Sequence, residues 1–328
     1  MSVSVRPPNV VLIGGTGFIG QHLAARLSDD GVGVLVPVRH YESAKQLTML
    51  PGVDVEVANI HDDAVLRKLL AGRDAVINLV GVLHGGHGRP YGEGFRHLHV
   101  ELPRRIAAAC ADVGVPRYLH MSALGADSSN PSSSPSMYGR SKSDGELAAR
   151  SQPTVAATVF RPSVVFGPGD HFLTMFARLQ RHLPLVPLAA SRARFQPVYV
   201  GDVAAAFSIA LARPDLRDAT IELGGPAVYT LGQLVRLAGR FAGRERPVLG
   251  LPDWAARLQA RLFELLPGDP LVSRDNLDSM LVDNVVAADT HALTAESLGI
   301  KLTAIESAAP HYLNRHDRLD AYRTHAGR

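Results

Sequence analysis

Short apolar runs alternate with longer segments in which apolar residues recur at spacings of three and four. The apolar runs are Asn9–Ile13, Val32–Val38, Val53–Val57, Ala75–Val80, Arg117–Met121 and Thr154–Phe160. The segments between them are Phe18–Asp29, Tyr41–Leu50, Asp62–Leu70, Phe95–Val113 and Tyr138–Arg150. The first pattern predicts buried strands and the second predicts amphipathic helices. Strand and helix alternating in this way predict an α/β fold with a doubly wound parallel sheet, covered by helices on both faces.

The regular alternation ends after Arg161, and helical stretches separated by Pro and Gly follow. These stretches are Leu231–Phe241, Trp254–Leu266 and Thr303–Ala309. We therefore predict a nucleotide-binding domain over residues 1–168, to which 198–223 returns, and a smaller, mostly helical substrate or partner domain over 169–328. The charged run from Asn314 to Arg328 is expected to be a solvated tail.

One helical segment of the second domain is strongly amphipathic. Trp254, the only tryptophan, shares a face with Leu258, Leu262 and Leu265. We expect this face to pack against the nucleotide-binding core. The alternative is a membrane surface or a partner protein, as for other helices with one apolar and one charged face.

Composition narrows the range of partners and compartments. The 34 Lys plus Arg against 31 Asp plus Glu leave 34 − 31 = +3, with no basic block, so no nucleic-acid partner is expected. Cys110 is the only cysteine, which excludes an internal disulfide and a thiolate metal cluster. We predict no metal site, and we place His84 and His87 in a loop. The chain lacks a signal-peptide pattern and an apolar run long enough to span a membrane, so we expect a cytoplasmic protein, or one peripheral at the cytoplasmic side of the inner membrane.

A glycine-rich turn directly follows the first predicted strand and opens the first predicted helix. Gly14, Gly17 and Gly20 are spaced so that the chain can turn tightly, approach a pyrophosphate closely and pack helix on strand. The N–H groups at the start of the helix would then face the phosphates. This context predicts a Rossmann-type dinucleotide site, with Thr16, Phe18 and Ile19 among its contacts.

The residue after the second strand bears on which dinucleotide binds. NAD enzymes usually place Asp or Glu there, whereas this chain has Arg39. A guanidinium can bind a 2′-phosphate, and no carboxylate is present to repel one. We therefore favour NADP(H) over NAD(H), which remains the alternative.

Tyr138 and Lys142 begin another predicted helix, and their spacing of four residues places them on one face. A tyrosine that transfers a proton needs a pKa below its usual value of about 10, and a nearby ammonium lowers it. The lysine can also hold the nicotinamide ribose. We assign both residues to the cofactor site and to catalysis.

With these motifs, the chain resembles the extended short-chain dehydrogenase/reductase superfamily. Arg161–Asp170 is similar to the family's R-P-x-x-V-[YF]-G-P signature, and Pro197–Ala204 is similar to a later structural element. The resemblance implies a nicotinamide contact at Pro162 and Val164. It implies further cofactor contacts, which fall at Asn59, Ile60, Val80 and Gly81.

A narrower resemblance points to the nucleotide-binding accessory subunit family of respiratory complex I. Four segments carry this resemblance: Asp170–Leu173, Phe195–Val200, Ser273–Asn276 and Ser297–Ile300. It implies an atypical family member that holds NADP(H) without established turnover. The implied partners are the dinucleotide, respiratory complex I or a membrane surface, and an unknown small-molecule substrate that is quinone-related.

The chain departs from the superfamily pattern mainly at the reaction centre. The family's catalytic Ser or Thr falls at Ala123, so Ser122 is the remaining candidate for that role. The family's helix asparagine falls at His99, and its adenine-binding Asp falls at Asn59. These departures favour a nucleotide held for structure or redox sensing. The alternatives are an active reductase or epimerase using Tyr138 and Lys142, and a quinone-biosynthesis or respiratory assembly factor.

Overall fold

The computed structural model describes residues 8–265, 268 and 270–314. The predicted solvated tail lies outside the described residues. Contacts divide the chain into two units, each built from separated segments of sequence. The first contains residues 1–162, 201–223 and 287–301, and the second contains 163–200, 224–286 and 302–328.

The first unit is built on a parallel sheet of eight strands in the order β14-β11-β6-β5-β4-β1-β2-β3. The strands are β1 (Asn9–Ile13), β2 (Gly33–Val38), β3 (Val53–Val57), β4 (Ala75–Asn78), β5 (Arg117–Met121), β6 (Ala156–Pro162), β11 (Thr220–Leu223) and β14 (Leu293–Thr294). This order reverses beside β1, as in doubly wound Rossmann-type sheets, which bind ligands at the carboxyl ends of the strands at that point. The predicted α/β fold class is confirmed.

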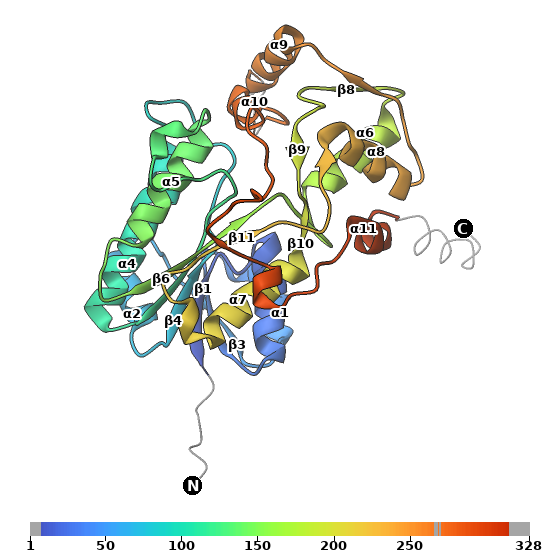
Figure 1. Ribbon diagram of the computed structural model, residues 1–328. Helices are drawn as coiled ribbons and strands as arrows, with labels where there is room; N and C mark the ends of the chain where they lie inside the picture. The colour runs from blue at the N-terminus through green and yellow to red at the C-terminus, as the bar shows by residue number, and fades with distance from the viewer. Residues whose placement is uncertain (1–7, 266–267, 269, 315–328) are drawn as a thin grey trace, which may run out of the picture. The chain divides into compact units, whose positions relative to one another are not determined.

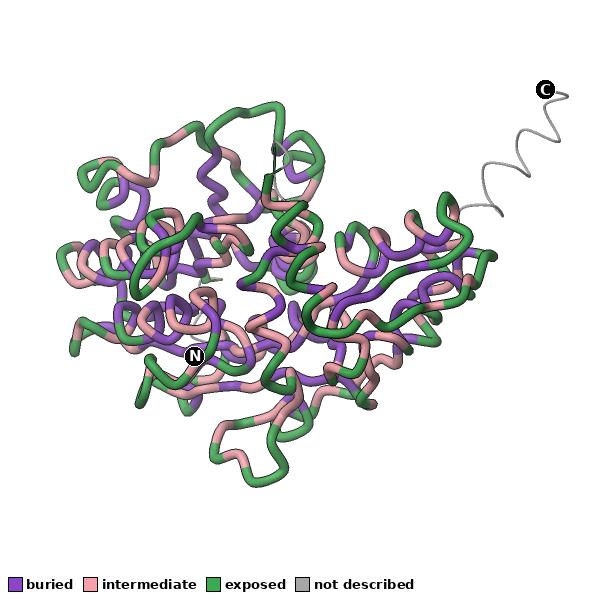
Figure 2. Tube along the Cα trace, turned by 90° about the horizontal axis from the view of Figure 1, so that it is seen from above, coloured by how far each residue is buried: buried purple, intermediate pink, exposed green. Residues whose placement is uncertain are grey.

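Helices cover both faces of this sheet (Figure 1). They are α1 (Phe18–Asp29), α2 (Asp63–Leu70), the short α3 (Glu93–Phe95), α4 (Leu102–Val113), α5 (Met137–Ala149) and α7 (Val200–Ala212). One core joins α2, α4 and α5 to the sheet. On the other face, Phe207 of α7 stacks on Phe160 of β6 with ring centroids 3.7 Å apart. The central strands β1, β4 and β5 are almost wholly buried, as expected for parallel strands covered on both faces. Figure 2 marks the buried residues of the chain in purple.

Two of the predicted helices of the first unit are interrupted in the structure. Tyr41–Leu50 forms two 3₁₀ turns, Tyr41–Ala44 and Leu47–Met49, and not one helix. Pro51 disfavours helical backbone at Leu50, which is extended. Between α3 and α4, residues Arg96–Glu101 form a π-helical turn. Pro103 follows, and because it has no N–H, it cannot donate to the carbonyl of His99 as a regular helix would require.

The second unit has a helical core and three two-stranded ladders. Its helices are α6 (Phe172–His182), α8 (Leu231–Phe241), α9 (Asp253–Glu264), α10 (Arg274–Ser279) and α11 (Ile305–Leu313). Its strands pair as β7 (Val165–Phe166) with β10 (Val198–Tyr199), β8 (Val186–Leu188) with β13 (Val248–Gly250), and β9 (Arg194–Phe195) with β12 (Tyr229–Thr230). Apolar residues of α6, α8 and α11 form one core, and α9 and α10 share a smaller one.

Candidate functional site

The glycine turn between β1 and α1 has the geometry that a pyrophosphate needs. Gly14 has a φ of +86°, and the Gly17 N–H donates to the Gly14 carbonyl at 3.1 Å. Gly17 then caps α1 without a side chain that could occupy the first N–H groups of the helix. Thr16, Phe18 and Ile19 surround this cap and are only partly buried.

Gly17 and Gly20 serve different purposes in this turn. A Cβ on Gly20 would lie 2.3 Å from the Gly14 carbonyl oxygen, so Gly20 is required for α1 to pack on the turn. A Cβ on Gly17, which is exposed, would meet only that same oxygen, at 3.3 Å. The space next to Gly17 is therefore open in the protein itself, and the turn fits a dinucleotide phosphate.

The predicted adenosine end follows β2 and β3. Arg39 is exposed, and with the rest of the described chain it forms no hydrogen bond or ion pair. The Asn59 side chain accepts the His61 N–H at 3.1 Å and shapes the local turn, while Ile60 packs against the core. Arg39 also lies close enough to His61 to help lower the pKa of that imidazole, after burial and the nearby His97 and Arg105.

Helix α5 places three functional groups on one face at four-residue intervals: Tyr138, Lys142 and Glu146. The Ser136 hydroxyl starts this helix by accepting the Gly139 N–H at 3.0 Å. The Lys142 Nζ donates to the Met121 carbonyl at 3.2 Å, and it lies 5.9 Å from the centre of the Tyr138 ring. The helix thus holds the tyrosine and lysine together, as their spacing predicts.

Lys142 also approaches the end of β4. A Cβ on Gly81 would lie 3.0 Å from the Lys142 Nζ, so glycine at this position lets the lysine approach closely. The Val80 N–H donates to the Asn78 side chain at 3.1 Å, which fixes the backbone just before Gly81. Two of the predicted cofactor residues, Gly81 and Lys142, are therefore brought together from distant parts of the chain.

The expected lowering of the Tyr138 pKa is not found. Burial raises the pKa of Tyr138 to about 12, and burial lowers the pKa of Lys142 to about 8, with Glu146 partly opposing the change at Lys142. An ammonium lowers the pKa of a phenol when it lies close to the phenol oxygen. In the structure the ammonium is bonded to the Met121 carbonyl, and desolvation dominates at both groups.

Ser122, the remaining candidate for a catalytic hydroxyl, donates to the buried Glu146 carboxylate at 2.6 Å. Glu146 also accepts two hydrogen bonds from the Arg161 guanidinium, Nε–Oε1 at 2.8 Å and Nη2–Oε2 at 2.7 Å. The Ser122 hydroxyl is thus committed to a buried ion pair. Ala123, the next residue, has no hydroxyl to take its place.

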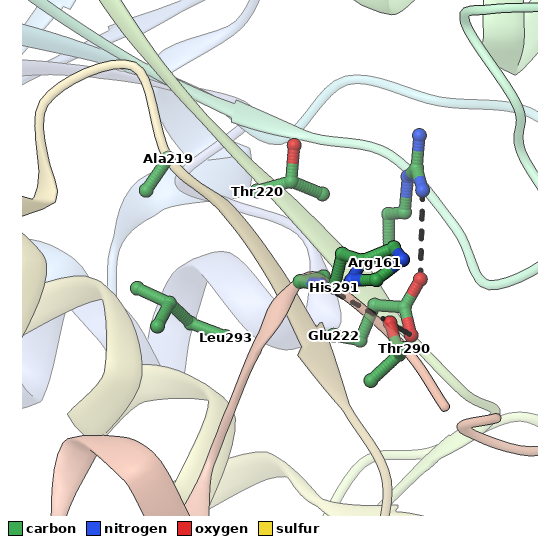
Figure 3. A pocket seen from close by; sticks show the side chains of 8 residues that line it. Arg161, Ala219, Thr220, Glu222, Thr290, His291 and Leu293 are labelled. Atoms are coloured by element: carbon green, nitrogen blue, oxygen red, sulfur yellow. Dashed lines mark hydrogen bonds and ion pairs between the residues drawn. The ribbon is translucent and has the colours of Figure 1, made fainter. Parts of the chain in front are cut away.

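Arg161 of β6 also lines a pocket of about 420 Å³, together with residues in and next to β11 and β14 (Figure 3). Its Nη1 lies 3.5 Å from Glu222, and the Thr290 hydroxyl donates to the other Glu222 oxygen at 3.0 Å. The His291 side chain also lines the pocket (Figure 3). The polar groups of Arg161, Glu222 and Thr290 already have protein partners, so we regard the pocket as the exposed end of a structural ion cluster.

His99 takes a defined structural role at the position of the family's asparagine. It is 1% exposed, and its Nε2 accepts the Val82 N–H at 3.0 Å, so its proton must be on Nδ1. Nδ1 lies 2.8 Å from the Ser141 hydroxyl, which donates to the Tyr138 carbonyl. Burial, with Lys142 nearby, lowers the pKa of His99 to about 2, so this histidine is neutral.

The two predicted nicotinamide contacts fall in different units. Pro162 ends β6 in the first unit and accepts the Leu124 N–H at 3.0 Å. Val164 belongs to the second unit, where its N–H donates to the Asn284 side chain at 3.1 Å. Their contact with nicotinamide stays a prediction.

Sequence reasoning missed Glu146 and the structural role of His99. Glu146 lies eight residues after Tyr138, on the same face of α5, and this spacing was the available signal. The partners that define its role, Ser122 and Arg161, are distant in sequence, so only the folded chain reveals them.

The sheet order and the glycine turn define a Rossmann-type nucleotide-binding unit of the extended short-chain dehydrogenase/reductase class. A model of the NAD dependent epimerase/dehydratase family matches residues 10–224, and the chain belongs to this family. It is homologous to the alpha subcomplex subunit 9 of mitochondrial NADH dehydrogenase (ubiquinone) 1. With the Rattus norvegicus protein, it shares 33% identity over 316 residues, which cover 93% of this chain and 79% of that one.

Two further comparisons extend this result. The chain is 27% identical over 244 residues to the ceramide reductase of Caulobacter vibrioides, with 74% of each chain covered. The solved structure of MoeE5 in complex with UDP-glucose and NAD matches with a TM-score of 0.69 at 17% identity, covering 93% of this chain and 96% of that one. The structural match supports the fold, and the family supports binding of a nicotinamide dinucleotide.

The glycine turn yields a paired prediction. Gly17→Val should leave the protein folded and abolish dinucleotide binding, because the branched side chain would fill the space next to the turn. Gly20→Val should instead lower the thermal midpoint, since its Cβ meets backbone at 2.3 Å. Circular dichroism and a fluorescence titration with NADPH test both variants. Full binding by folded Gly17→Val would show that the phosphate site lies elsewhere.

His99 yields a prediction about pH. Its pKa is lowered on folding, so the unfolded chain binds a proton below about pH 6.5 that the folded chain excludes, and stability falls as the pH drops. The effect approaches about 1.4 kcal/mol per pH unit. His99→Asn should therefore reduce the loss of unfolding free energy between pH 7 and 5, measured by urea denaturation. The exposed His40→Asn is the control, and equal pH dependence in wild type and His99→Asn would refute the prediction.

Proposed function

We propose that this protein holds NADP(H) for a structural or redox-sensing role, as a subunit or associate of a complex I-type assembly. The observation that carries the proposal is the hydrogen bond from Ser122 to Glu146. It removes the hydroxyl nearest the expected catalytic position, while the glycine turn, Gly81 and Lys142 retain the features of a dinucleotide site. The chain thus keeps the parts that bind a nucleotide and lacks the part that polarises a substrate carbonyl.

The preference for NADP(H) rests on Arg39. Its guanidinium is exposed after β2 and has no partner among the described residues, so it is available to a 2′-phosphate.

The proposed partner follows from the relatives. The rat relative is named as a subunit of mitochondrial NADH dehydrogenase (ubiquinone), and the match spans nearly the whole of this chain. We propose association with the corresponding respiratory assembly, at the cytoplasmic side of the inner membrane, where a quinone-related molecule is the candidate ligand. A role as a quinone-biosynthesis or respiratory assembly factor is the alternative for the same association. No helix in the described part of the chain is long and apolar enough to cross a membrane.

An active reductase is the second candidate, and Tyr138 and Lys142 favour it. The Caulobacter vibrioides relative is named a ceramide reductase, which supports a reductase role as the alternative. A bound nicotinamide would supply hydride transfer, and Tyr138 would hold the proton at its phenol oxygen. Lys142, with its pKa near 8, would then position the ribose and exchange protons near neutral pH.

NADPH should bind at least about tenfold more tightly than NADH, because charge-assisted hydrogen bonds from Arg39 contribute roughly 1.5–3 kcal/mol. Arg39→Ala should remove most of this preference, and the exposed Lys68→Ala should preserve it. Fluorescence titrations with both nucleotides measure the ratio. Equal affinities in the wild-type protein would refute the preference.

Lys142→Ala should weaken NADPH binding, whereas Tyr138→Phe should change it little. General ketone and sugar-nucleotide substrates should turn over slowly or not at all. A titration and an absorbance assay at 340 nm separate binding from turnover. Brisk turnover that Tyr138→Phe abolishes without weakening NADPH binding would replace the carrier proposal with the reductase.

A further inference from the structure

Helix α9 (Asp253–Glu264) buries its alanines and exposes its largest apolar side chains. Ala256 and Ala260 are 4% and 0% exposed and pack with Leu277 of α10. Trp254 and Leu262 are 72% and 56% exposed. The exposed fractions contradict the packing expected for this face from the sequence. A helix that needed only internal packing would bury its largest apolar side chains.

The exposed residues form one continuous row. Trp254, Leu258 and Leu262 are spaced by four residues, and Leu265 follows three residues later at 77% exposure. This spacing places Trp254, Leu258 and Leu262 on one face of α9, and Leu265, the C-cap residue with helical backbone, continues that face. We call these four residues the apolar row. Large contiguous apolar surfaces of this kind mark contact sites.

Two arginines border the apolar row, but only one is available. Arg257 lies 3.2 Å from Asp278 and ties α9 to α10. Arg261 is exposed and forms no ion pair with any described residue. It precedes Leu265 by four residues and follows Trp254 by seven, so it lies on the same side of the helix as the apolar row. A free cation next to Trp and Leu side chains complements an anionic headgroup above a hydrocarbon layer.

The size of the apolar row also argues against a rigid protein partner. A helix of twelve residues is about 18 Å long. Four side chains on such a helix, even if fully covered, fall short of the roughly 800 Å² per partner that stable protein interfaces bury. A convex row of Trp and Leu can instead insert between lipids, where tryptophan is favoured at the boundary of headgroups and acyl chains.

We infer that α9 is a membrane-surface element that binds an anionic bilayer through the apolar row and Arg261. The inference goes beyond the proposed nucleotide role and does not depend on it, because α9 belongs to the second unit and the glycine turn to the first.

Trp254 is the only tryptophan, so its fluorescence reports directly on this surface. The experiment adds phosphatidylcholine vesicles, with or without phosphatidylglycerol, to the full-length protein. We expect a blue shift of the emission and co-flotation of the protein, both stronger with phosphatidylglycerol. Unchanged emission and no flotation with either vesicle would overturn the inference. A blue shift that grows with protein concentration without lipid would also overturn it, in favour of self-association.

Variants test the named residues. Leu258→Ser combined with Leu262→Ser keeps the reporter and should lower the partition coefficient at least about tenfold, given the cost of losing two buried leucines. Arg261→Gln should remove most of the preference for anionic vesicles. Met49→Ser is the matched control, since Met49 is 84% exposed in the first unit. Wild-type binding by the double variant would overturn the inference. NADPH titration of each variant separates this result from the fate of the proposed nucleotide role.

Discussion

The candidate site depends on the hydrogen bonds and ion pair that the Glu146 carboxylate forms with Ser122 and Arg161. It is fully buried and accepts hydrogen bonds from Ser122 at the end of β5 and from Arg161 in β6. A carboxylate in such surroundings is stable only when nearby groups compensate its charge. Because Glu146 lies two turns after Tyr138, the same contacts fix the rotation of α5. The contacts of Glu146 thus help to set the position of the tyrosine and the lysine.

In this arrangement the Ser122 hydroxyl has a structural partner, the Glu146 carboxylate. Ser122 stabilises the folded state by donating a hydrogen bond to the buried Glu146 carboxylate. The polar atoms of His99 are likewise bonded to other groups of the protein. With Nε2 held by a backbone N–H and Nδ1 by Ser141, the imidazole joins the β4 loop to α5 and stays uncharged. Both residues stabilise the site, and neither has a free polar atom for a substrate.

The sequence predicted those features that depend on local pattern. β1, β3, β5 and α1 have the expected bounds, because each is a short apolar run or a regular amphipathic repeat with clear ends. The glycine turn could be predicted because its residues are adjacent to β1. The π-helical turn at Arg96–Glu101 could not, since it depends on the missing N–H of Pro103 and on packing against α5. Gly145 shows that packing directly: a Cβ there would lie 2.3 Å from the His99 carbonyl oxygen.

The two-residue strand β14 has a consequence for the integrity of the chain. It pairs with β11 and forms one end of the large sheet, although it is encoded after α10 of the second unit. Without Leu293–Thr294, β11 would be an unpaired edge with free backbone groups, which is a template for aggregation. A fragment ending near residue 286 would therefore contain seven of the eight strands of the large sheet and would still expose the unpaired backbone edge of β11. Residues 287–301 supply the strand that covers this edge. The sheet of the first unit is therefore complete only after these residues have been synthesised.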